Sequence, residues 1–240
     1  MSRISFDNFA QSAAAGHLSD TEAAGRYDFQ RDAELQMVAD VALKLNLQAS
    51  DQLLDIGCGP GRLLLPLSRL VANACGIDNA AMIERVRARA GPDSSIRTLT
   101  GNFLDLDLSA SRYDKILVHG VVQYLGTAAE VTTFIVRAAS LLTPRGRLLI
   151  GDLPNETKKA RFLGSTTGKR MAVEWASLTA HGHPMDGLPR DPSVVSFNDD
   201  LVMHLLSIVR AAGYESYLLP QPAGLPFGRS REDMLVVARD

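Results

Sequence analysis

The chain has 240 residues, 46% of them hydrophobic and 22% charged, a composition ordinary for a globular domain. The formal net charge is −2, whereas nucleic-acid-binding proteins usually carry a basic excess, so we expect no nucleic-acid partner. No 18-residue apolar stretch occurs, and the N-terminal segment lacks the apolar core of a signal peptide, so we expect no membrane partner. Cys58 and Cys75 lack metal or redox spacing, which favours a reduced, cytoplasmic protein.

The first predicted element is a helix in the leader, residues 1–50. Leu35, Val38, Ala42 and Leu45 recur at helical spacing, so we expect them to share the face that packs on the core.

A buried strand is predicted next, over Leu53–Ile56, and glycines follow it at alternate positions: Gly57, Gly59 and Gly61. Glycine permits positive φ and lets a ligand lie against bare backbone. A leucine-rich helical pattern then begins. This succession of strand, glycine turn and helix is typical of sites for nucleotide-like ligands.

The glycine spacing excludes the dinucleotide version of such a site. That fingerprint, G-x-G-x-x-G, requires glycine at position 62 or 64, where this chain has Arg62 and Leu64. An NAD-dependent oxidoreductase is therefore disfavoured.

The strand predicted over Asn73–Asp78 ends on an acidic residue about 20 positions beyond the glycine turn, where doubly wound folds place a carboxylate against a ribose. An ionised carboxylate accepts hydrogen bonds from both ribose hydroxyls. The alternative for Asp78 is a turn residue or helix cap, although Asn79 already fits the cap of the next helix.

The string Asp-x-Gly-x-Gly-x-Gly, from Asp55 to Gly61, resembles the signature loop of class I S-adenosylmethionine (SAM)-dependent methyltransferases. The resemblance implies an α/β Rossmann-like sandwich with helices on both faces of a seven-stranded, mostly parallel sheet. Its strand order would be 3-2-1-4-5-7-6, with the last strand antiparallel. It also implies SAM as methyl donor, S-adenosylhomocysteine (SAH) as product, and these cofactor-binding residues: Asp55, Gly57, Cys58, Gly59, Gly61, Asp78, Asn79, Asn102, Phe103 and His119.

Two later strands carry further parts of this resemblance. After the strand predicted over 95–101, Asn102 would bind the adenine edge and Phe103 would cover its face; the alternative is a turn Asn and a core Phe. His119 lies at the carboxyl end of the strand predicted over 113–120, the edge where ligands bind. It either contacts the cofactor or is a neutral, hydrogen-bonded histidine, and Gln123 is a weaker candidate for the pocket wall.

A fifth strand is predicted over Leu148–Ile150, after a turn at Pro144 and Gly146. We expect one domain over 1–240: a helical lid (1–50), a SAM-binding half (51–152), an insertion forming much of the acceptor pocket (153–197) and a C-terminal helix with a β-hairpin (198–240). By analogy with lids of relatives, Tyr27 and Arg31 would touch SAM or the acceptor; an ordinary packing helix is the alternative.

The expected reaction is in-line displacement at a methyl carbon, in which positioning of the acceptor is the main task. His181, His183 and Asp152 are the candidates for a general base. A metal site on the two histidines and Asp186 has no strong ligand pattern, so we expect no metal.

We therefore expect methyl transfer to a hydroxyl or amine of a small polar metabolite, for example a sugar derivative, by a monomer or homodimer. The alternative is an inactive methyltransferase-like SAM-binding or scaffold protein. One basic cluster would either steer an anionic substrate or form a solvated surface: Lys158, Lys159, Arg161, Lys169 and Arg170.

Overall fold

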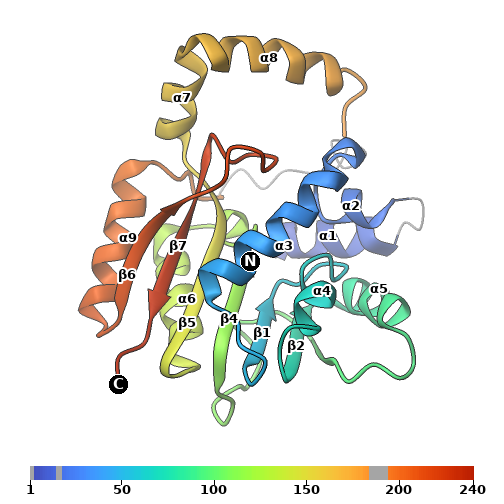
Figure 1. Ribbon diagram of the computed structural model, residues 1–240, viewed down its shortest axis with the longest axis vertical. Helices are drawn as coiled ribbons and strands as arrows, with labels where there is room; N and C mark the ends of the chain where they lie inside the picture. Colours follow the sequence, from blue (N-terminus) through green and yellow to red (C-terminus); the bar gives the residue numbers. More distant parts are fainter. Residues whose placement is uncertain (1–2, 15–17, 184–193) are drawn as a thin grey trace.

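A seven-stranded sheet forms the centre of the protein (Figure 1). The computed structural model describes residues 3–14, 18–183 and 194–240. Strand order is β3-β2-β1-β4-β5-β7-β6; β1 to β5 are parallel, and β7 is antiparallel to β5 and β6. This confirms the predicted topology. The strands are β1 Gln52–Ile56, β2 Asn73–Asp78, β3 Arg97–Thr100, β4 Tyr113–His119, β5 Leu142–Pro154, β6 Glu215–Pro220 and β7 Arg231–Val237.

Helices cover both faces of the sheet because its strand residues alternate between two apolar clusters. Leu53, Leu117 and Leu149 pack with α3 and α4, whereas the neighbouring Leu54 and Leu148 pack with α6 and α9. The helices are α1 Arg3–Ala14, α2 Asp20–Ala23, α3 Arg31–Leu45, α4 Leu64–Ser68, α5 Ala80–Ala90, α6 Ala128–Ser140, α7 Glu156–Gly164, α8 Thr166–Leu178 and α9 Asp199–Ala211, with the 3-10 turns η1 Asp28–Gln30 and η2 Val122–Tyr124.

The buried face of α3 agrees with the predicted one except at Leu35. Leu45 is buried, and Val38 and Ala42 pack partly buried against the core, as expected. Leu35 is 76% exposed, and the most buried positions of the helix also include Glu34, Met37 and Val41. The reason is electrostatic: the Glu34 carboxylate accepts hydrogen bonds from Arg62 of the glycine turn. A charged residue at this position therefore fixes the rotation of the helix.

The turn predicted before the fifth strand is part of the strand itself. β5 begins at Leu142, and the segment holding Pro144 and Gly146 is accommodated as an irregularity in the pairing with β4. Arg145 takes the left-handed conformation there, with φ 60°. A bulge absorbs the extra residues without ending the strand.

The insertion after β5 folds into α7 and α8, which arch over the carboxyl edge of the sheet towards α2 (Figure 1). Within the described ranges, no helix is long and apolar enough to cross a membrane. Most of the basic cluster is paired with carboxylates, as expected of a solvated surface: Lys158 with Glu232, Lys159 with Glu156, Arg161 with Asp199 and Arg170 with Glu174.

Candidate active site

The glycine turn after β1 has the backbone conformation that its sequence predicts. Gly57, Gly59 and Gly61 have φ values of 75°, 53° and 80°, which side chains with a Cβ rarely adopt. A Cβ on Gly57 would lie 2.5 Å from a Val121 methyl, whereas a Cβ on Gly59 would meet no atom within 4 Å. The turn is thus packed against the loop after β4 at Gly57 and open at Gly59.

Asp78, at the carboxyl end of β2, faces this turn. Its Oδ2 accepts from the Gly59 N–H at 2.8 Å, and its Oδ1 accepts from the Asn79 N–H at 2.7 Å. Burial raises the pKa of Asp78 to about 6, because a charged carboxylate loses hydration there.

Asp55, at the end of β1, is a buried carboxyl beside the partly buried Asp78. Burial, together with the charge of Asp78, raises the pKa of Asp55 to about 8. Among the described residues, Asp55 takes part in no side-chain hydrogen bond or ion pair. A buried carboxyl of this kind fits a ligand that brings its own cation or donors.

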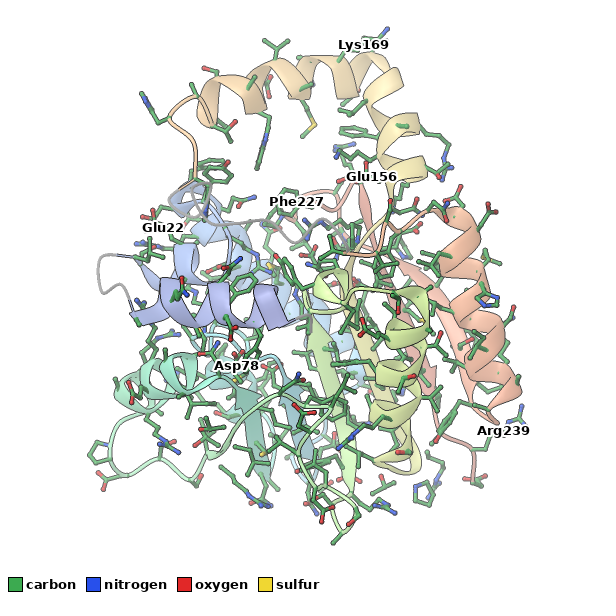
Figure 2. All side chains as sticks on the ribbon, turned by 180° about the vertical axis from the view of Figure 1, so that it is seen from behind. Glu22, Asp78, Glu156, Lys169, Phe227 and Arg239 are labelled. Carbon is green, nitrogen blue, oxygen red and sulfur yellow. The ribbon has the colours of Figure 1, made fainter. Side chains whose placement is uncertain are left out.

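These groups line a cleft with about 900 Å³ of empty space, partly open to solvent. The cleft lies at the carboxyl edge of the parallel strands, where open α/β sheets bind ligands; Asp78 is labelled there in Figure 2. Of the residues singled out from the sequence, these line it: Asp55, Gly57, Cys58, Gly59, Asp78, His119, Gln123 and Asp152.

Asn102 and Phe103 line a smaller adjoining cavity together with Gly57 and Asp78. Asn102 Oδ1 accepts from the backbone N–H of Leu104 at 3.2 Å, and Phe103 is a buried core residue. Asn102 is thus a turn residue and Phe103 a core residue, and both also border the smaller cavity. Their adenine contacts remain a prediction.

Two predicted cofactor residues, Asn79 and Gly61, line neither the cleft nor the smaller adjoining cavity. Asn79 caps α5, its Oδ1 accepting from the Met82 N–H at 3.0 Å. Gly61 supports the turn from behind, because a Cβ there would lie 3.1–3.2 Å from side-chain atoms of Leu65 and Val86. Their places in the structure are those of a helix cap and a packing glycine.

Asp152 lies in a bulge of β5, where pairing with β7 shifts register between Ile150 and Leu153. Its φ is 62°, and its N–H donates to Asp233 Oδ1 at 2.8 Å. The bulge directs its carboxylate into the cleft. There, Asp152 Oδ2 lies 2.5 Å from Arg231 Nη1 and 3.9 Å from Arg26 Nη2.

The charges around Asp152 determine its protonation. Burial raises the pKa of Asp152, but the Arg231 guanidinium and the charge of Arg26 hold it below its usual value. Burial, the largest cause, lowers the pKa of His119 to about 4, so its ring is neutral near pH 7. Its Nδ1 lies 3.4 Å from Arg26, which donates to it and thus assigns the ring proton to Nε2.

The two histidines predicted as bases are not brought to the cleft. His181 is exposed in the turn after α8. His183 Nε2 lies 2.9 Å from the Arg26 carbonyl oxygen, and its ring contacts Tyr27 edge-on at 4.9 Å. Within the described ranges, no group of three His, Cys, Asp or Glu residues could hold a metal. Asp186 lies outside the described residues.

Tyr27 and Arg31, the expected lid contacts, do not line the cleft, and their contact with SAM or the acceptor stays a prediction. Tyr27 packs against Phe29 and Trp175, and Arg31 is exposed beside Asp28. Arg26 is the leader arginine that lines the cleft. The leader covers the cleft through α1 and α2, as expected of a lid.

Sequence reasoning missed Arg26, Phe227 and Arg231. None belongs to a local motif. The available signal was strand pairing, because β7 places Arg231 opposite Pro154, two residues from Asp152.

Comparison with known proteins finds similarity to methyltransferases. A model of the methyltransferase domain matches residues 54–150. Ubiquinone biosynthesis O-methyltransferase of Nitrobacter winogradskyi is 34% identical over 162 residues, covering 65% of this chain and 58% of that protein. The match thus spans less than two thirds of that relative.

Two solved structures share the fold. One is magnesium protoporphyrin IX methyltransferase from Synechocystis PCC 6803 with bound SAH, with a TM-score of 0.60, 17% identity and coverage of 99% of this chain and 95% of that one. The other is the N-methyltransferase NodS from Bradyrhizobium japonicum WM9 in complex with SAH, with a TM-score of 0.60, 19% identity and coverage of 98% and 99%.

The sheet order, glycine turn and strand-end carboxylates define a doubly wound nucleotide-type site. Residues 54–150 of the chain match a methyltransferase domain, and the fold around them is that of class I SAM-dependent methyltransferases.

Proposed function

We propose that the chain transfers a methyl group from SAM to a hydroxyl or amine of a small molecule. The observation that carries the proposal is the placement of Asp78 against the open Gly59 position, at the edge of a 900 Å³ cleft. The O-methyltransferase name of the Nitrobacter relative favours a hydroxyl.

The residues of the cleft fit SAM group by group. Asp78 would accept hydrogen bonds from the ribose hydroxyls, and Asn102 and Phe103 would border the adenine. Asp55, a buried carboxyl with no described partner, would meet the cationic end of the methionine part. SAM supplies a methyl carbon that its sulfonium already activates.

The two cleft residues that could deprotonate the acceptor, Asp152 and His119, are both poor bases. Asp152 is a poor base because Arg231 and Arg26 stabilise its ionised form. His119 is a poor base because its Nδ1 faces Arg26 and its pKa is about 4. We propose that Asp152 acts by holding the two arginines in place, and that holding the acceptor in line carries most of the rate enhancement.

The test is calorimetric titration of SAM into the wild-type protein and Asp78→Ala. Loss of a charged hydrogen-bond acceptor costs about 1.5–3 kcal/mol, so SAM affinity should fall roughly 10- to 100-fold. Asp93→Ala, which removes an exposed carboxylate from the loop after α5, is the matched control and should bind like wild type.

An unchanged dissociation constant in a folded Asp78→Ala protein would refute the ribose contact. If SAM does not bind the wild-type protein at sub-millimolar concentration, the proposed function is wrong. Tight SAM binding without SAH formation across a panel of hydroxyl and amine acceptors would favour the non-catalytic alternative.

A further inference from the structure

A second cavity, with about 1110 Å³ of empty space and partly open to solvent, lies beneath the arch of α7 and α8. Its lining is largely apolar and aromatic, and includes Phe162, Leu163, Met171, Trp175 and Phe227. Apolar lining with a few polar groups is typical of small-molecule sites.

This cavity meets the cleft at two residues. Phe227 and Arg231 line both spaces, and the Arg231 guanidinium lies 4.1 Å from the Phe227 ring centroid. Figure 2 shows Phe227 beneath the arch. The Phe227 ring also contacts Trp175 of α8, at 5.7 Å between centroids. A molecule under the arch would therefore lie next to the cleft that we assign to SAM.

The charges of the lining indicate which group such a molecule carries. Lys159 pairs with Glu156 at 3.4 Å, and Arg231 pairs with Asp152 at 2.5 Å. Arg229 lies 5.8 Å from the ring centroid of Phe162, and among the described residues it has no carboxylate partner. The lining thus offers one uncompensated guanidinium, whose planar fork matches a single carboxylate.

We propose that the cavity under the arch is the acceptor subsite, and that it takes an apolar aromatic molecule carrying one carboxylate. The assignment rests on the proposed methyl transfer, since it identifies the second half of the same site. The ring system would pack among the aromatic and Met171 side chains, with the carboxylate at Arg229. This lining favours such an acceptor over the sugar-like one expected from overall charge.

Trp175 makes the cavity directly observable, because it is the single tryptophan of the chain and lies in the lining. The probes are 2-naphthoate and its neutral isostere 2-naphthamide, titrated against Trp175 emission in the full chain. We expect 2-naphthoate to quench with about 5- to 10-fold higher affinity than 2-naphthamide, as one charge-assisted hydrogen-bonded pair near solvent would give.

Two variants locate the contacts. Arg229→Gln should lower the affinity for 2-naphthoate to that for 2-naphthamide. The affinity for 2-naphthamide should stay unchanged. Met171→Glu places a charge inside the cavity and should abolish the binding of both probes. Val173→Glu adds the same charge to the same helix at a 73% exposed position outside the lining, and should leave both affinities unchanged.

Equal affinity for the two probes, absence of quenching, or full binding by Met171→Glu would each overturn the assignment. The proposed function fails separately, in the SAM titration. The Asp78→Ala variant distinguishes the SAM site from the acceptor subsite, because it should weaken SAM binding and leave 2-naphthoate binding intact. Thermal unfolding of every variant verifies that a lost signal is not a lost fold.

Discussion

Replacing Asp55 with asparagine should change how the stability of the ligand-free protein depends on pH. The pKa of Asp55 is about 8 in the folded protein and near 3.8 in the unfolded chain. Between these values the folded state binds more protons than the unfolded state, so stability falls as pH rises. Each pH unit in this window costs up to 1.36 kcal/mol, which makes about 3 kcal/mol the upper limit between pH 5 and 7.

Asp55→Asn cannot ionise, so its stability should fall less over the same interval. The raised pKa of Asp78, about 6, contributes in both proteins and accounts for the remaining slope below pH 6. Urea unfolding at pH 5, 6, 7 and 7.5, followed by circular dichroism, measures the difference, and Asp93→Asn serves as an exposed control. Parallel pH profiles for wild type and D55N would refute the account of Asp55 as a buried, raised-pKa carboxyl.

Three further predictions concern the glycine turn and the two histidines. Gly57→Ala should destabilise the protein by about 2 kcal/mol or more, since its Cβ would meet Val121 at 2.5 Å, whereas Gly59→Ala should cost only about 1 kcal/mol of backbone strain and still weaken SAM binding by narrowing the cleft. Equal destabilisation of the two variants in chemical unfolding would contradict this geometry. His181→Ala should retain the wild-type methylation rate and pH profile, because the ring is exposed outside the cleft; a ten-fold loss of kcat would restore it as a base candidate. His183→Ala should increase proteolytic cleavage near residue 26, whose carbonyl it contacts, without shifting the pH profile of kcat; an unchanged digestion pattern would show that this contact does not hold the leader.

The sequence predicts the sheet and the geometry of the glycine turn well because both rest on local rules. An apolar strand followed by Gly57, Gly59 and Gly61 determines a turn with three positive φ values. Asp78 follows from its distance to that turn, and the Asn79 cap from its place before an amphipathic helix.

The acceptor side depends on contacts between distant segments, which local patterns do not contain. The bulge at Asp152 arises from the mismatched register of β5 and β7. Arg26 reaches the cleft because Glu34 and Arg62 dock the leader on the glycine turn. The apolar character of the second cavity appears only when α8 is folded back over Phe227.

A crystal structure of this chain with SAH is the most direct test of whether the cleft beside the glycine turn binds SAM. We predict the ribose hydroxyls on the Asp78 carboxylate, the adenine between Asn102 and Phe103, and the sulfur directed towards the junction at Phe227. An SAH molecule bound elsewhere, or bound with its ribose away from Asp78, would contradict the assignment.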